Sequence, residues 1–193
     1  MAAANPKEVE IKFRVSGAAE LERKLRALGF RELTPRTLEV NTLYDLPTGA
    51  LRRRGEVLRI RRYGEAWKVT HKSKGSIGRH KSRVEWETEV SSGDALGRIL
   101  GALGFRPSFV YEKFRSEWSD GAGHVVLDQT PIGHFAEIEG APRWIDRIAR
   151  ALGVLPGQYI TESYAALFDQ WKQSTRSRAQ NMTFAEVRDV APR

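Results

Sequence analysis

The chain has 193 residues, of which 40% are hydrophobic and 29% are charged, and its formal net charge is +8. These proportions are typical of a soluble globular protein with one sizeable core, and the excess of positive charge favours an anionic partner. Cysteine is absent, which excludes disulfides, thiolate metal sites and a cysteine nucleophile. No apolar run approaches the roughly 20 residues that span a bilayer, so we expect a cytoplasmic protein without a membrane partner.

In the first half of the chain, one amphipathic helix is expected among several strands. Leu21, Leu25 and Leu28 recur at helical spacing in residues 18–28, and Gly29 follows as a stop signal. Alternation of polar and apolar residues predicts the strands, which are bounded by turn residues such as those around Gly64. The predicted strands cover residues 7–15, 39–45, 56–63, 66–72 and 81–90.

The second half of the chain resembles the first in its order of elements. A helix is expected over residues 91–103, a strand over 105–119, and a hairpin of strands 124–129 and 134–139. Two further helices are predicted over residues 142–152 and 161–171. Eight antiparallel strands with few helices indicate a mainly β (α+β) fold with a closed or strongly curved sheet. We expect one domain over residues 1–173 and a loosely ordered C-terminal tail over residues 174–193.

The segment Glu8-Val9-Glu10-Ile11-Lys12 opens the first predicted strand. Side chains alternate between the two faces of a strand, so Glu8, Glu10 and Lys12 share one face. Two carboxylates about 7 Å apart can hold a hard divalent cation, and a neighbouring lysine can hold an anion. Taken alone, the same pattern is also typical of a half-exposed strand with solvated charges.

The same alternation of charged residues returns in most of the other predicted strands. Its members are Arg59 and Arg61; Thr70 and Lys72; Arg83, Glu85, Glu87 and Glu89; Lys113 and Arg115; Asp128; and Glu137 and Glu139. If the sheet closes, these faces could line the inside of a barrel while the apolar faces turn outward under the helices. Buried charges on this scale need opposite charges, a metal or a ligand as partners.

These motifs, taken in their order along residues 7–172, resemble those of the CYTH superfamily. This family of triphosphate tunnel metalloenzymes includes thiamine triphosphatases, tripolyphosphatases and class IV adenylate cyclases. The resemblance implies a closed eight-stranded antiparallel β-barrel tunnel with flanking helices. It also implies a lumen that binds a triphosphate-containing small molecule together with one or two Mg²⁺ or Mn²⁺ ions.

The resemblance also assigns roles to residues of this sequence. It implies that the triphosphate is bound by Lys12, Arg59, Arg61, Lys72, Arg83, Lys113 and Arg115, and that the metal ligands are Glu8, Glu10 and Glu139. Positions for a second metal or for orienting the attacking water are Glu85, Glu87, Asp128 and Glu137. The residues expected to act in catalysis are Lys12, Arg59, Arg61 and Glu137, through positioning and charge neutralisation. In the C-terminal helix, Tyr164 matches a position where the family often has a basic or tyrosine residue.

The function that this sequence favours is metal-dependent hydrolysis of the terminal phosphoanhydride of a triphosphate, either inorganic or organic. An adenylate cyclase that makes cyclic AMP and pyrophosphate from ATP is the first alternative. A non-catalytic module that binds polyphosphate or RNA is the second, although the interleaved acidic residues argue against specific nucleic-acid binding. A monomer or a homodimer is compatible with the sequence.

Overall fold

The computed structural model of the chain describes residues 7–188. Eight antiparallel strands close into a ring in the order β1-β9-β8-β7-β2-β3-β4-β6, and β6 pairs back with β1. The short strand β5 pairs with β6. The strands are β1 (Lys7–Val15), β2 (Arg31–Asp45), β3 (Val57–Tyr63), β4 (Ala66–Lys72), β5 (Ser76–Ile77), β6 (Lys81–Val90), β7 (Arg106–Ser119), β8 (Gly123–Thr130) and β9 (Gly133–Gly140). The predicted closed eight-stranded barrel is thereby confirmed.

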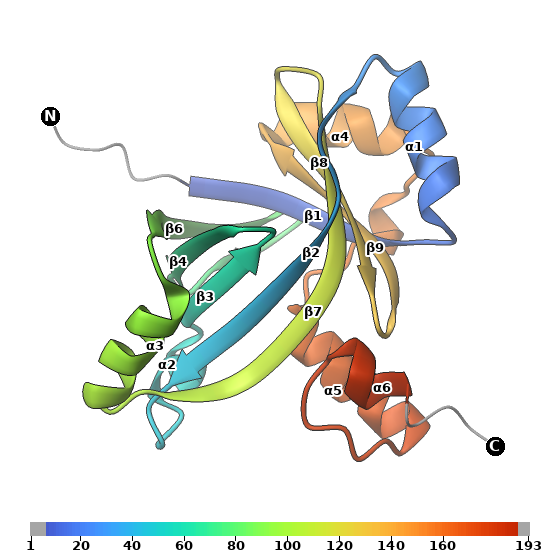
Figure 1. The fold of residues 1–193 in the computed structure, drawn as a ribbon. Coiled ribbons are helices and arrows are strands. Elements are labelled where there is room, and N and C mark those ends of the chain that lie inside the picture. The colour runs from blue at the N-terminus through green and yellow to red at the C-terminus, as the bar shows by residue number, and fades with distance from the viewer. Residues whose placement is uncertain (1–6, 189–193) are drawn as a thin grey trace, which may run out of the picture.

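The apolar faces of the strands point outward and form the main core together with two helices. Helix α1 (Ala18–Ala27) and helix α4 (Pro142–Ala151) lie beside β8 and β9 in Figure 1. Ile11 and Ile138 from the strands pack with Leu25 of α1 and Ile145 of α4, and each is at most 3% exposed. Burial of this outer surface leaves the charged faces to line the interior of the barrel.

Two more helices lie at the end of the barrel where β2 finishes (Figure 1). Helix α2 (Ala50–Arg54) was not predicted from the sequence, whereas helix α3 (Gly93–Ala102) matches its prediction closely. Asp45 holds α2 in place because its carboxylate accepts hydrogen bonds from the backbone N–H groups of Leu51 and Arg52, at 2.9 and 3.0 Å. In α3, the Ser92 hydroxyl accepts a hydrogen bond from the Ala95 N–H and caps the helix.

A second core forms where helix α5 (Tyr164–Thr175) packs beside β7. A single turn of 3₁₀-helix, Pro156–Gln158, precedes α5, and the short helix α6 (Phe184–Arg188) follows it. Phe168 of α5 is 1% exposed, and its ring centroid lies 5.6 Å from that of Phe109 on β7. Helix α5 also reaches α2, since Arg52 pairs with Asp169 at 3.2 Å.

The segment after Ser174 is packed more closely than the predicted loose tail. Met182 is fully buried, forms a β-bridge with Tyr111, and exchanges backbone hydrogen bonds with Val110 and Glu112 on β7. Its apolar side chain joins the α5 core, which is why a polar stretch of sequence can still be fixed in place. The end of the predicted tail, residues 189–193, lies outside the described residues, and the division of the chain at residue 173 stays a prediction.

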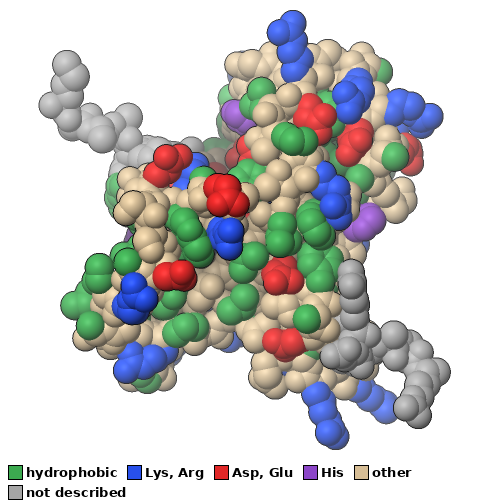
Figure 2. All heavy atoms as spheres, viewed as in Figure 1, with side chains coloured by type: hydrophobic (Ala, Val, Ile, Leu, Met, Phe, Trp, Pro, Cys, Tyr) green, Lys and Arg blue, Asp and Glu red, His purple; other side chains and the backbone are tan. Residues whose placement is uncertain are grey.

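The surface shows no single basic stripe on the face drawn in Figure 2. Lys and Arg side chains alternate there with Asp, Glu and hydrophobic side chains. This distribution differs from the clustered basic surface typical of a nucleic-acid binder. Among residues 7–188, the structure contains no helix with the length and apolar character needed to cross a membrane.

Candidate functional site

The interior of the barrel holds a cavity of about 1090 Å³. Strands β1, β3, β4, β6, β7 and β9 contribute charged side chains to its wall, and the start of α5 contributes residues 161–166. The structure brings almost all of the predicted site residues together here: Glu8, Glu10, Lys12, Arg59, Arg61, Lys72, Arg83, Glu85, Glu87, Lys113, Arg115, Glu137 and Glu139. Asp128 is the exception, since it is 1% exposed and lies behind the wall.

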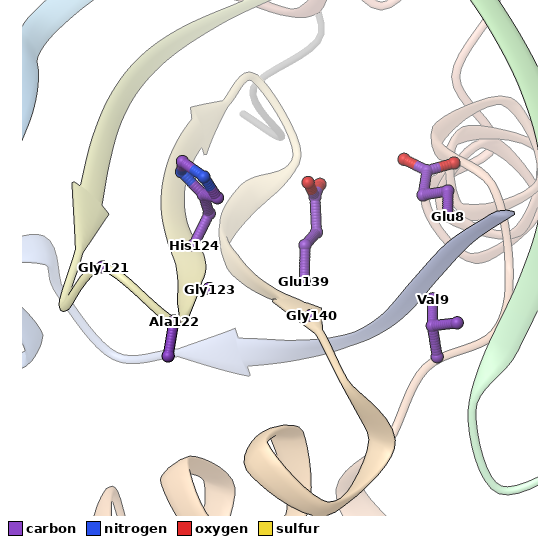
Figure 3. Close-up of a pocket in the computed structure, with 8 residues that line it drawn as sticks. All are labelled: Glu8, Val9, Gly121, Ala122, Gly123, His124, Glu139 and Gly140. Carbon is purple, nitrogen blue, oxygen red and sulfur yellow. The ribbon is translucent and has the colours of Figure 1, made fainter. Parts of the chain in front are cut away.

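Three of the predicted metal ligands converge at one place in the cavity. Glu10 on β1 is the register partner of Glu139 on β9. Glu8 lies two residues before Glu10, on the same face of β1. One carboxylate oxygen from each of these three residues lies within 4.8 Å of the other two. In Figure 3, Glu8, Glu139 and His124 project to one side of the sheet and Val9 to the other. We call Glu8, Glu10 and Glu139 the carboxylate trio.

The members of the carboxylate trio differ in their ion pairs. Glu8 pairs with Lys72 and Arg83 at 3.2 and 3.3 Å, and Glu10 pairs with Lys81 at 3.0 Å. Glu139 forms no ion pair within residues 7–188. Its burial and the nearby charges of Glu137, Glu8 and Glu10 raise its pKa to about 8. Three carboxylates this close together offer the oxygen ligands that a divalent cation such as Mg²⁺ or Mn²⁺ prefers, so the donor set agrees with the predicted metal.

The wall formed by β3, β4 and β6 carries guanidinium groups held by one carboxylate. Glu87 accepts from Arg61 at 2.8 Å, from Lys68 at 3.1 Å and from the hydroxyl of Thr70 at 2.9 Å. Burial alone would raise the pKa of Glu87, but Arg61 and these hydrogen bonds lower it. The Nε atoms of Arg59 and Arg61 are buried, and neither has a hydrogen-bond acceptor in the described part of the chain. Both arginines line the cavity, so their guanidinium groups can bind an anion there.

The wall formed by β7 continues the positive surface. Lys113 and Arg115 contact the buried Asp128 at 2.9 and 2.6 Å, and Arg115 also contacts Glu137 at 2.8 Å. Glu137 in turn lies 3.1 Å from Lys12, its register partner on β1. Although burial would raise the pKa of Glu137, Lys12 and Arg115 hold it well below its usual range, so this carboxylate stays ionised. The network fixes the positions of all three cations.

Tyr164 connects α5 to the charged interior. Its hydroxyl donates a 2.6 Å hydrogen bond to Asp128, and Lys12 Nζ lies 4.2 Å from the centre of its ring. The hydroxyl of Ser163 accepts from the backbone N–H of Ala166, which begins the helix beside the cavity. Burial and the charge of Asp128 raise the pKa of Tyr164, which therefore remains protonated as a hydrogen-bond donor.

Several residues of the interior were not among the predicted site residues. Glu39 and Asn41 on β2 are fully buried, and Tyr111 on β7 approaches Arg59 with its hydroxyl at 3.4 Å. Lys81 pairs with Glu10. On the inner face of the predicted β2 span, Asn41 and Leu43 separate Glu39 from Asp45, so the strand lacks the pair of charges two residues apart that marked the other strands. The alternation of Glu39 and Asn41 with Val40 and Thr42 is the signal that could have placed them inside.

Sequence comparison then assigns the chain to a family, because the sequence profile of the CYTH domain matches residues 6–164. The chain belongs to the CYTH family. Members of this family are enzymes that act on triphosphates, and the arrangement of charges in the tunnel agrees with that substrate class. No curated protein sequence matches the chain significantly.

Solved structures of other CYTH-type proteins share the fold. A protein of Vibrio parahaemolyticus, provisionally named an adenylate cyclase, is 20% identical with a TM-score of 0.77, covering 86% of this chain and 99% of that one. PH1819 of Pyrococcus horikoshii OT3 is 25% identical with a TM-score of 0.71, covering 85% and 99%. HpAC1 of Hippeastrum, provisionally named an adenylyl cyclase and described as having a dominant triphosphatase activity, is 20% identical with a TM-score of 0.68, covering 85% and 96%.

Proposed function

We propose that this CYTH protein is a metal-dependent triphosphatase that hydrolyses the terminal phosphoanhydride of a triphosphate inside the tunnel. The observation that supports this most strongly is that the carboxylate trio and the guanidinium groups of Arg59 and Arg61 line one cavity. A metal–triphosphate complex presents both kinds of charge, whereas a bare anion would be repelled by the carboxylates.

The triphosphate is held by the cations of the wall in this proposal. Arg59 and Arg61 grip phosphate oxygens with paired N–H groups, and Lys72, Arg83, Lys113 and Arg115 add single charges or further N–H donors. The ion pairs of Arg61 with Glu87 and of Arg115 with Asp128 already fix these two side chains before the substrate binds. Donors that need little rearrangement stabilise the charge that develops during phosphoryl transfer most effectively.

Glu8, Glu10 and Glu139 would hold the metal in this proposal. A bound Mg²⁺ or Mn²⁺ supplies charge neutralisation at the phosphate oxygens. Glu85 and Glu87 remain beside Lys72 and Arg61, where their charges balance the cations of the wall.

The attacking water is oriented by the pair of Lys12 and Glu137. Glu137 is ionised, so its oxygen can accept a hydrogen bond from water, and Lys12 keeps the carboxylate in place at 3.1 Å. The water oxygen forms a bond to the terminal phosphorus while the bridging P–O bond breaks. The products are orthophosphate and the remaining diphosphate.

Cyclisation of ATP is the second candidate, because two of the structural relatives carry a provisional cyclase name. The experiment that separates the candidates supplies the purified chain with ATP, tripolyphosphate and thiamine triphosphate, each with Mg²⁺ or Mn²⁺. Release of orthophosphate supports the triphosphatase. Formation of cyclic AMP and pyrophosphate from ATP would contradict it. Binding that needs no metal and weakens steeply with salt, without turnover, would favour a binding module instead.

A further inference from the structure

A histidine lies beside the carboxylate trio and has no role in the proposed hydrolysis. We propose that His124 on β8 supplies a nitrogen ligand to the metal held by the trio, and that the protein therefore binds a first-row transition ion such as Mn²⁺ in preference to Mg²⁺. The inference rests on the proposed function, since it adds a ligand at the same metal site and names the ion that this ligand selects.

His124 stands in one row with two members of the trio. It is the register partner of Glu139 across β8 and β9, and Glu139 is in turn the register partner of Glu10 across β9 and β1. Register partners point to the same face of a sheet, with Cβ atoms about 4.5–5.5 Å apart. Figure 3 shows the side chains of His124, Glu139 and Glu8 on one side of their strands. The imidazole therefore faces the space that the carboxylates border.

The surroundings of His124 leave room for the imidazole to turn towards an ion. A second cavity, of about 330 Å³, meets the main cavity at Glu8, Glu139 and His124, which line both. The imidazole stands outside the group of ligand atoms that lie within 4.8 Å of one another, so ligation requires a rotation about its side-chain bonds. His124 is exposed, and its neighbours in the lining of the smaller cavity are the small residues Gly121, Ala122 and Gly123.

The cations that pair with the trio favour a metal position near His124. Arg83 pairs with Glu8 at 3.3 Å, and Lys81 pairs with Glu10 at 3.0 Å. Both cations belong to β6, which borders β1 on the side away from β9. Lysine and arginine charges repel a divalent cation, so the cation is most stable on the side of the trio that faces β8. The imidazole lies on that side.

His124 also differs from the two histidines that are held by carboxylates. His71 pairs with Glu56 at 3.7 Å, and His80 pairs with Asp146 at 2.9 Å. Within residues 7–188, no carboxylate oxygen lies within 4.0 Å of a ring nitrogen of His124. A neutral imidazole presents a lone pair on one nitrogen, which makes histidine a common metal ligand.

A nitrogen ligand distinguishes between the two ions that the carboxylates alone would accept. Mg²⁺ prefers oxygen ligands in near-ideal octahedral geometry and loses its water reluctantly, so an imidazole adds little to its affinity. First-row transition ions accept nitrogen, and Mn²⁺ is the weakest binder of that series. A preference that is measurable for Mn²⁺ should therefore be larger for Co²⁺ or Zn²⁺.

The test measures metal binding in the absence of substrate. Calorimetry gives Kd for Mn²⁺ and for Mg²⁺ in the wild type and in His124→Ala, each treated with chelator beforehand. The variant should bind Mn²⁺ roughly tenfold more weakly and should change its affinity for Mg²⁺ less than twofold. Pulsed electron paramagnetic resonance of bound Mn²⁺ should detect a nitrogen ligand in the wild type and lose that signal in the variant.

His134→Ala is the matched control, because His134 is the register partner of Val15 on the outer face of the barrel. It should leave both affinities and the nitrogen signal as in the wild type. Three results would overturn the inference: no binding of Mn²⁺, no nitrogen signal in the wild type, or an equal loss of Mn²⁺ and Mg²⁺ affinity in His124→Ala. The last would show that the imidazole acts only through Glu139. A wild type that binds Mn²⁺ with the nitrogen signal but releases no orthophosphate would contradict the proposed function alone.

Discussion

Lys113 Nζ lies 3.2 Å from the carboxylate of Glu39, its register partner across β2 and β7, and both side chains are buried. Glu39 also faces Arg61 at 3.5 Å. Burial alone would raise the pKa of Glu39, but Lys113, Arg115 and Arg61 hold it well below its usual range. Glu39 therefore balances the charges of cations that we propose bind the triphosphate.

Removal of this carboxylate should destabilise the fold. Glu39→Ala removes one carboxylate from a buried cluster of cations, and breaking a buried ion pair in this way typically costs about 3–5 kcal/mol of the free energy of unfolding. Denaturant unfolding at pH 7 measures this loss of stability. Because the pKa is lowered in the folded state, the stabilisation is present above the unfolded pKa near 4.5 and is lost as the pH falls below it. Glu65→Ala is the control, since Glu65 is 99% exposed; an equal effect of both changes would contradict the account.

Two adjacent arginines on β3 offer a matched test of phosphate binding. Arg61 faces the cavity, whereas Arg62 points away and donates to the carbonyl of Gly64. A lysine keeps the charge but loses the paired N–H geometry, so Arg61→Lys should lower kcat/KM for tripolyphosphate by about tenfold or more. Arg62→Lys should change it less than twofold, within the scatter of surface substitutions. Steady-state kinetics would contradict the assignment if the two variants behaved alike.

Metal binding should depend on pH through Glu139. Its pKa of about 8 in the metal-free protein means that a cation must displace a proton below that pH. The affinity for Mn²⁺ should therefore rise as the pH increases from about 6.5 to 8.5. Calorimetry in two buffers of different ionisation enthalpy should detect release of close to one proton at pH 7. Binding without proton release would show that Glu139 is already ionised.

The same raised pKa affects the stability of the metal-free protein. The folded state keeps the Glu139 proton up to a pH near 8, whereas the unfolded state loses it near 4.5. The favourable contribution of the Glu139 proton to the free energy of unfolding is therefore present below pH 4.5 and is lost as the pH rises through 8. Glu139→Gln removes this titrating group. In chelator-treated samples, the free energy of unfolding of this variant should therefore change less with pH over that range. A profile that stays the same in the variant would contradict the raised pKa.

Several strands were predictable because alternation and turn residues act locally. Strands β1, β4 and β6 begin and end where the sequence predicted, and their charged faces line the cavity except at Glu89, which is exposed. The first part of β2 was missed because residues 31–38 are largely exposed and include register shifts near Thr34, which remove the alternation. Glu39 was missed because its neighbours two residues away on the strand face, Thr37 and Asn41, are uncharged, and only the neighbouring strand shows that it is buried.

The packed segment after α5 could not be predicted from local sequence either. Met182 is one apolar residue in a polar stretch, and its contact with Tyr111 joins residues far apart in the chain. Met182→Ala should lower the free energy of unfolding by about 2–5 kcal/mol, as for other fully buried methionines. Leu155→Ala, at a site that is 67% exposed, is the control for thermal or denaturant unfolding. Equal stability of the two variants would restore the prediction of a loose tail.

In the proposed function, the carboxylate trio and the cations of the wall together hydrolyse a triphosphate. The most direct measurement is orthophosphate release from tripolyphosphate, with Mg²⁺ or Mn²⁺ and after chelation, in the wild type, Glu10→Gln and the surface control Glu65→Gln. We predict metal-dependent release in the wild type and the control, and a loss of about 100-fold or more in Glu10→Gln. Release that persists without metal, or that is equal in Glu10→Gln and the wild type, would contradict the account.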